Sequence, residues 1–269
     1  MNDVISVLGL AVIGSFIGLI GGIVFLYNKR WSVWLSENSV PFAAGVLLTV
    51  ALVGLLPEAV HAIGETAYIV VLLAFLGGYL FEHIFFDIHH HEGHSHNNFK
   101  SSVPLVIVGD TIHNFIDGVA IAASYYVSPG LGLVTAVSTL LHEIPHEIGD
   151  FGILLSAGWK KKNVLLANIA SASTTLLGAL FVILFTQNES IVGGMLAIAS
   201  GLFLYLGSSD FLPHVHEGKE NSKKNVWYLL VGVAVMLLTF MAIPHTHGDE
   251  ESIHDASASS EQTSGSDYI

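Results

Sequence analysis

The chain of 269 residues contains no cysteine, and only 12% of its residues are charged. The absence of cysteine excludes a disulfide framework and a thiolate metal site. A soluble domain of this length would normally carry about twice this charged fraction. Because 52% of the residues are hydrophobic and the mean hydropathy is +0.65, we interpret the chain as an integral protein of a lipid bilayer.

Basic residues are scarce as well, with nine Lys and Arg against 22 Asp and Glu and a formal net charge of −13. Nucleic acid is excluded as a partner because its binding needs a basic surface, whereas this charge suits a protein that handles cations. The first residues, MNDVISVLGL, lack the basic n-region and cleavage site of a signal peptide. We expect residues 4–26 to form a retained first span.

Long apolar stretches dominate the remaining sequence, and eight of them reach the roughly 20 residues that a helix needs to cross a bilayer. Closed barrels are the alternative in lipid, but the alternating polarity of barrel strands does not occur. We predict an all-α, polytopic membrane protein whose transmembrane domain covers residues 1–243. The eight predicted transmembrane helices lie near 4–26, 40–60, 67–87, 103–125, 131–157, 163–186, 191–212 and 226–243.

The basic residues occupy alternate loops, after spans one, three, five and seven, as expected for loops on the cytoplasmic side. They are Lys29, Arg30, Lys100, Lys160, Lys161, Lys162, Lys219, Lys223 and Lys224. Eight spans make this pattern consistent. It predicts that both termini lie outside the cytoplasm.

A short repeat links two span ends, GLLPEAVHA (54–62) and DFLPHVHEG (210–218). The predicted topology places them on opposite sides of the membrane, which is typical of an inverted repeat, here around the central helix pair. Chance similarity of a short LP match is the alternative.

Two polar segments lie outside the spans. The cytoplasmic loop 88–102 is rich in histidine. The extracytoplasmic tail 244–269 is rich in His, acidic residues and Ser, so we expect the tail to be disordered. The loop histidines that could bind metal are His89, His90, His91, His94 and His96. A solvated loop without specific affinity is the alternative.

Polar residues, most of them ionisable, form two stripes in spans four and five, because residues three, four and seven apart share a helix face. The first stripe comprises Asp110, His113, Asn114 and Asp117. The second comprises Thr139, His142, Glu143, His146, Glu147 and Asp150. No Lys or Arg occurs between Ser101 and Trp159, so five carboxylates have no cationic neighbour in sequence.

A divalent metal ion would neutralise such stripes, since imidazole and carboxylate are ligands of zinc and its first-row neighbours. Polar contacts between helices are the alternative interpretation, which suits a lone histidine better than two full stripes. Pro145 frees a backbone carbonyl and predicts a kink beside a polar passage. Gly118 and Gly149 would allow another helix to pack closely.

The segment HEIPH (142–146) also matches the H-E-x-x-H motif of zinc proteases, in which glutamate activates a metal-bound water. An intramembrane metalloprotease is therefore the alternative function. Against it, Pro145 interrupts the helix that this motif requires, and the ligands are more numerous than one catalytic site needs.

The motifs HNFIDG (113–118) and HEIPHEIGDF (142–151) resemble those of the ZIP family of divalent-metal transporters, in particular its LIV-1 branch. Eight spans and a His-rich loop after span three extend the resemblance over nearly the whole chain. It implies a transporter and not an enzyme, with a binuclear metal centre midway through the membrane. The residues implied are His113, Asn114, Asp117, His142, Glu143 and His146.

Two features depart from this family pattern. Leu141 stands where branch members usually have Cys or Glu before the histidine, and residues 167–180 lack the acidic residue that some members add. A second metal site would then be weaker or would use Asn168 or Ser171.

The resemblance implies uptake of Zn²⁺ into the cytoplasm across the cell membrane, plasma or inner, by alternating access. It also suggests a homodimer and up to two bound ions, while the same ligands would serve Fe²⁺, Mn²⁺ or Cd²⁺. We expect further polar residues to line the metal pathway: Asp110, Glu147, Asp150, Glu58, His61 and Asp210. For the residues at span ends, side chains that simply reach into water are the alternative.

Overall fold

The computed structural model describes residues 2–27, 29–90, 98–185, 188–213 and 222–244. These residues form helices and contain no strand, which confirms the all-α fold. The elements are α1 (Asn2–Phe16), α2 (Leu19–Tyr27), α3 (Lys29–Thr49), η1 (Val50–Leu55), α4 (Leu56–Ile63), α5 (Thr66–His90), α6 (Asn98–Val127), α7 (Pro129–Ser156), α8 (Lys161–Ala172), α9 (Thr174–Ile183), α10 (Glu189–Tyr205), η2 (Leu206–Phe211) and α11 (Ser222–Ala242). Here η1 and η2 are π-helical turns.

Several of these elements join end to end into single rods, such as α1 with α2 and α8 with α9. Within the described residues, seven rods are long and apolar enough to cross a membrane. Helix α7 is not among them because its polar stripe lowers its hydropathy. Its 28 residues nevertheless extend about 42 Å, more than the roughly 30 Å of a hydrocarbon core. The predicted multi-pass membrane architecture is therefore confirmed.

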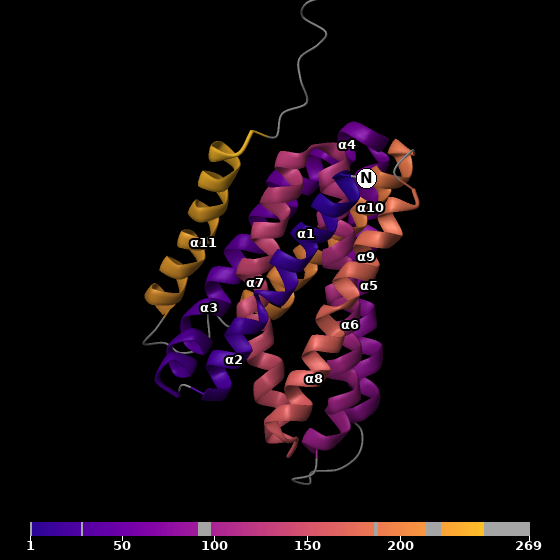
Figure 1. The fold of residues 1–269 in the computed structure, drawn as a ribbon. Helices are drawn as coiled ribbons and strands as arrows, with labels where there is room; N and C mark the ends of the chain where they lie inside the picture. Colours follow the sequence, from indigo (N-terminus) through magenta and orange to yellow (C-terminus); the bar gives the residue numbers. More distant parts are fainter. Residues whose placement is uncertain (1, 28, 91–97, 186–187, 214–221, 245–269) are drawn as a thin grey trace, which may run out of the picture.

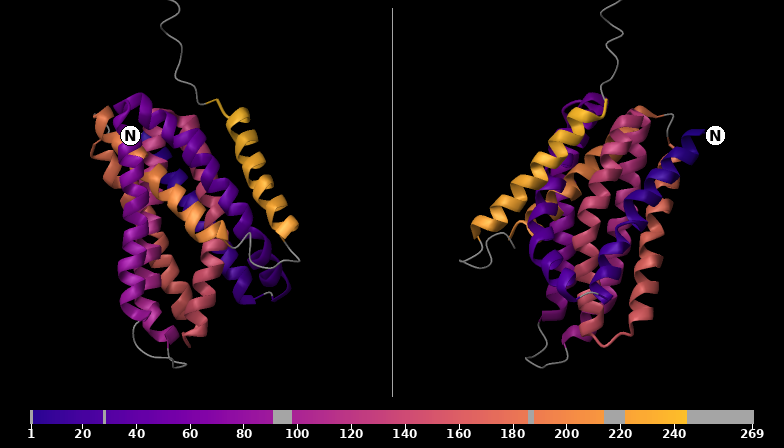
Figure 2. Two further views of the ribbon diagram at one scale, coloured as in Figure 1. Left: turned by 180° about the vertical axis from the view of Figure 1, so that it is seen from behind. Right: turned by 60° about the vertical axis from the view of Figure 1, so that its left-hand side comes forward.

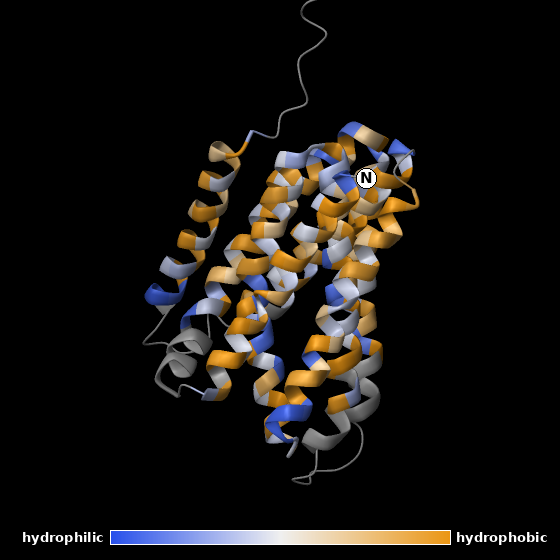
Figure 3. Cartoon of the chain, in the orientation of Figure 1, coloured by the Kyte–Doolittle hydropathy of each residue, from blue (hydrophilic) through white to orange (hydrophobic). Residues whose placement is uncertain are grey.

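The rods run alternately up and down through the molecule (Figures 1 and 2). As a result, the start of α1 and the end of α11 lie at the same end. Basic residues occur at the starts of α8 and α11, and Figure 3 shows hydrophilic colour at both. The start of α8 lies at the end of the molecule opposite the start of α1 (Figure 1). We call this the lysine-bearing end. The arrangement agrees with the predicted alternation of the loops.

Helices α6 and α7 lie side by side at the centre, enclosed by α1, α2, α3, α8, α9 and α10. Close approach to α9 depends on glycine. A Cβ atom at Gly118 would overlap the carbonyl oxygen of Thr175, and one at Gly178 would overlap that of Phe115. The prediction of close packing is thus confirmed for Gly118. It is wrong for Gly149, whose added Cβ would meet no atom within 4 Å because that face of α7 points outward.

The two segments of the sequence repeat share a local structure. A π-helical turn precedes each LP pair, η1 before Leu56–Pro57 and η2 before Leu212–Pro213. In both, the leucine N–H bonds the carbonyl five residues back, that of Ala51 or Gly207. Rods α3–η1 and α10–η2 run in opposite directions (Figure 2), and each π turn packs against the other rod. These features support the inverted repeat, which stays a prediction.

We predict that Gly118→Ala destabilises the protein by about 1–3 kcal/mol, because the added methyl group overpacks the α6–α9 contact. Thermal unfolding in detergent measures the change. Gly149→Ala is the matched control and should be neutral or slightly stabilising, since alanine favours helices by about 0.5–1 kcal/mol over glycine. Equal effects of the two substitutions would contradict the close contact.

Candidate metal centre

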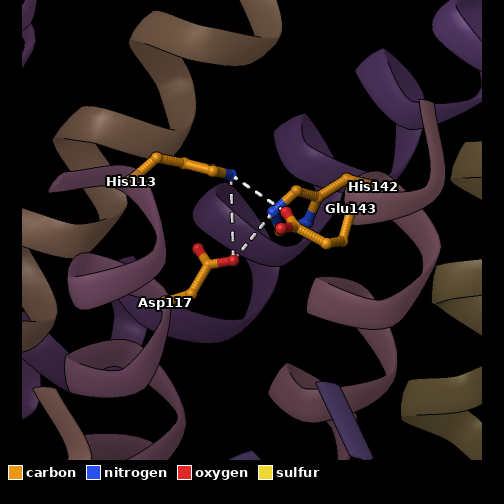
Figure 4. Close-up of side chains that lie close together, drawn as sticks. All are labelled: His113, Asp117, His142 and Glu143. Atoms are coloured by element: carbon orange, nitrogen blue, oxygen red, sulfur yellow. Dashed lines mark ion pairs between the residues drawn. The ribbon is translucent and has the colours of Figure 1, made fainter. Parts of the chain in front are cut away.

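Four ionisable side chains from α6 and α7 converge in the interior, and we call them the His–Asp centre: His113, Asp117, His142 and Glu143. Figure 4 shows the two α6 side chains pointing toward the two from α7. The Nε2 atom of His142 lies 3.2 Å from Asp117 Oδ2. The Nε2 atom of His113 lies 3.5 Å from Glu143 Oε2 and 3.8 Å from Asp117 Oδ2.

The centre is dry. His113 is 5% exposed, and the other three side chains have no exposed surface. Both nitrogens of His113 and all four carboxylate oxygens of Asp117 and Glu143 lack a hydrogen-bond partner within the described part of the chain. Buried polar atoms are rarely left unsatisfied, so this concentration requires an explanation. A cation held among these atoms supplies one.

The orientation of His142 suits it to bind such a cation. Its Nδ1 lies 2.9 Å from the carbonyl oxygen of Ser138. A carbonyl can only accept a hydrogen bond, so Nδ1–H donates and the neutral ring leaves the Nε2 lone pair facing the centre. Glu143 packs closely against the turn between α1 and α2. At Gly18 in this turn, an added Cβ atom would overlap the Glu143 side chain, so only glycine leaves it room.

Two further groups of possible ligands continue along the same helix interface. The lower triad, nearer the lysine-bearing end, consists of Asp110, His146 and Asp150. His146 Nδ1 lies 3.7 Å from Asp110 Oδ1 and 3.8 Å from Asp150 Oδ2. The carboxylate triad consists of Asp110, Glu143 and Glu147. It shares Glu143 with the His–Asp centre and Asp110 with the lower triad, so the three groups form a continuous ladder.

Asn114 lies beside these groups and contacts Asp110. Its Oδ1 accepts hydrogen bonds from Ser15 of α1, at 3.1 Å, and from Thr175 of α9, at 3.0 Å. Its Nδ2 donates to the carboxylate of Asp110 at 2.8 Å and to the Asp110 carbonyl at 3.2 Å. In this conformation Asn114 therefore positions Asp110 and ties α6 to its neighbours, while its oxygen is occupied by two hydroxyl donors.

The other predicted residues lie elsewhere. Glu58 and His61 line a separate cavity of about 310 Å³, together with Glu189, at the end opposite the lysines. On α8, the buried Asn168 donates to the carbonyl of Val164 in its own helix. The side chain of Asp210 is not among those that the structure describes. The same holds for those of His89 and His90, and His91, His94, His96 and the tail 245–269 fall outside the described residues.

The ladder contains five carboxylates: Asp110, Asp117, Glu143, Glu147 and Asp150. Among the described side chains, histidines are their sole ionic partners. Five acidic groups thus face three imidazoles in a dry interior. A bare carboxylate in such surroundings is unfavourable by several kcal/mol. Imidazole nitrogens and carboxylate oxygens together form a ligand set suited to zinc and related divalent ions.

Comparison with known proteins agrees with this chemistry. The sequence model of the ZIP zinc transporter family matches residues 89–239, more than half of the chain. The chain belongs to the ZIP zinc transporter family. The matched region contains α6, α7 and every residue of the ladder.

Named relatives include zinc transporter ZIP13 of Mus musculus, which is 42% identical over 147 residues, covering 52% of this chain and 40% of the relative. Zinc transporter foi of Drosophila melanogaster is 35% identical over 137 residues, which cover 50% of this chain and 19% of the relative. Metal cation symporter ZIP14 of Mus musculus is 38% identical over 147 residues, covering 51% and 30%. The chain therefore spans less than half the length of these relatives.

We predict that Zn²⁺ raises the unfolding temperature of the purified protein and that His142→Ala removes most of this effect. A ligand that binds only the folded state stabilises it by about 2.7 kcal/mol at one hundred times its dissociation constant. Thermal unfolding with and without Zn²⁺ measures this. The control is His83→Ala, on the exposed side of α5, which should keep the effect. Equal stabilisation of His142→Ala and wild type would contradict a centre at His142.

Proposed function

We propose that the protein carries Zn²⁺ across the membrane by alternating access, through the ladder between α6 and α7. The observation that supports this most strongly is the sharing of ligands. Glu143 belongs both to the His–Asp centre and to the carboxylate triad, and Asp110 belongs both to that triad and to the lower triad. An ion can move from one group to the next while a shared carboxylate stays bound. Membership of a zinc transporter family supports the same function.

Several ligands are needed because Zn²⁺ loses bound water when it enters a dry centre. The carboxylates offset this loss through charge, and imidazoles supply nitrogen ligands at ~2.0–2.1 Å. The His–Asp centre would take one ion and the lower triad a second. Fe²⁺, Mn²⁺ and Cd²⁺ would compete with zinc, since the same ligands bind them with graded affinity. Motif HEIPHEIGDF supports the LIV-1 branch.

The protease alternative is not favoured by the geometry. In an H-E-x-x-H protease both histidines bind one zinc ion while the glutamate acts on water. Here His142 belongs to the His–Asp centre with Glu143, whereas His146 belongs to the lower triad. The histidines therefore face different groups, and Glu143 stands among the ligands.

Uptake of Zn²⁺ into proteoliposomes tests the proposal. Wild-type protein should show saturable influx, which His142→Ala and Asp117→Ala should reduce at least about tenfold. Asp110→Asn should retain Zn²⁺ stabilisation but lose influx, because the link between the carboxylate triad and the lower triad is removed. Influx unchanged in all three variants would contradict the proposal. Influx that does not saturate would indicate a channel, and peptide cleavage without influx would indicate a protease.

We further propose that the lysine-bearing end faces the cytoplasm of a cell membrane, so that both termini lie outside. The proposed inward direction of transport rests on the family resemblance and not on this orientation. The positive-inside rule supports this orientation. Because the chain lacks cysteine, single cysteines report sidedness. An impermeant thiol reagent on intact cells should label Glu65→Cys and leave Ser156→Cys, at the lysine-bearing end, unlabelled. The reverse labelling would overturn the orientation.

A homodimer through α5 is also proposed. This helix turns large apolar side chains outward along its length, among them Ile69, Leu73 and Leu80. Of its glycine pair, Gly78 lies against the Tyr205 ring within the chain, whereas Gly77 has nothing within 4 Å. Gly77→Leu should lower the fraction of dimers counted by single-molecule photobleaching in liposomes. Gly9→Leu, at a similarly open position on α1, should not, and equal dimer fractions in both would contradict this interface.

A further inference from the structure

A cavity of about 340 Å³ lies between α5, α6, α7 and α10, beside the ladder. Asp110, His113, His146 and Asp150 border it, so both the His–Asp centre and the lower triad reach its wall. Most of the remaining wall is apolar, except for Glu82 of α5 and Tyr205 of α10. The cavity thus has ionisable groups of the ladder on α6 and α7 and one further carboxylate contributed by α5.

Glu82 is unusual for its helix. Of the seven possible membrane spans, the one in α5 is the least enclosed by the rest of the protein, with 6% of its residues buried. The residues near Glu82 in sequence, Tyr79, Leu80 and Ile84, are exposed and apolar. A carboxylate within a membrane span is unfavourable unless it faces protein or a polar cavity, and such residues commonly mark ion pathways. Glu82 lines the cavity instead of facing lipid.

Tyr205 holds this carboxylate. Its hydroxyl donates a hydrogen bond to Glu82. Gly78 leaves the space that the Tyr205 ring fills, and Phe75 packs edge-on against the ring with centroids 5.8 Å apart. Tyr205 is also the last residue of α10 before the π turn η2, and π turns are frequent at functional sites. The contact therefore joins α5 to α10 at the point where the helix geometry changes.

We propose that Glu82 is a further ligand of the transported cation, which crosses this cavity from the lower triad to reach it. The inference rests on the proposed function. An ion that leaves Asp110, His146 and Asp150 needs an anionic oxygen on the far side of an otherwise apolar space. Glu82 provides that oxygen, and Tyr205 keeps it in place between passages. From Glu82, α5 continues toward the lysine-bearing end and finishes at His90 (Figure 1).

Two substitutions separate a ligand from a structural latch. Glu82→Gln keeps an oxygen that accepts the Tyr205 hydrogen bond but removes the charge. Tyr205→Phe removes the hydrogen bond but keeps the charge. In proteoliposomes, Glu82→Gln should lower maximal Zn²⁺ influx at least about tenfold, with Zn²⁺ stabilisation of the purified protein unchanged, and Tyr205→Phe should retain most influx. Loss of influx in Tyr205→Phe with normal influx in Glu82→Gln would overturn the proposal.

A binding measurement tests Glu82 without relying on transport. In the cysteine-free chain, Glu82→Cys introduces one thiol, and Cd²⁺ should slow its reaction with a small thiol reagent because thiolate binds Cd²⁺. Leu72→Cys, at another exposed position of the same helix, should not be protected. Protection of Glu82→Cys, together with absent Zn²⁺ influx in the wild-type protein, would support Glu82 as a ligand and refute the carrier. Wild-type influx together with no slowing of the Glu82→Cys reaction by Cd²⁺ would refute Glu82 as a ligand.

Discussion

Five carboxylates enclosed by membrane helices, with only imidazole rings for ionic partners, set the main constraint on this molecule. Removing such groups from water is unfavourable, and the described helices bring no Lys or Arg side chain to them. The interior is therefore complementary to a cation, and it is held together by the rods around it. A cation bound among these groups would also stabilise the fold, since the same charges that oppose packing would attract it.

The surrounding rods fix these side chains from several directions. Ser138 orients the His142 ring, and Ser15 and Thr175 hold the amide of Asn114, which in turn holds Asp110. Close glycine contacts between α6 and α9 keep the backbones near enough for these short side chains to reach. The candidate ligands thus sit on helices packed from several sides, while the shared carboxylates Glu143 and Asp110 connect adjacent groups.

Helical spacing and the apolar surroundings were sufficient to predict the spans and the two facing stripes. The predicted set of six ligands came from the family resemblance, and it also contained Asn114 and His146, which do not belong to the His–Asp centre. Helical spacing could not predict that His146 turns to Asp110 and Asp150, because spacing fixes the face of a helix and leaves side-chain torsions open. The partners of Asn114 come from helices remote in sequence that carry no distinctive pattern. Glu82 did carry a signal, a carboxylate within an apolar span, but its significance depends on the cavity that α6 and α10 complete.

Anomalous diffraction from crystals grown with Zn²⁺ tests most directly whether these groups hold a divalent ion. The account predicts a zinc peak between α6 and α7, within ~2.0–2.2 Å of ligand atoms from His142 and Asp117. Zinc peaks confined to other parts of the chain, with no peak between these two helices at saturating Zn²⁺, would contradict it.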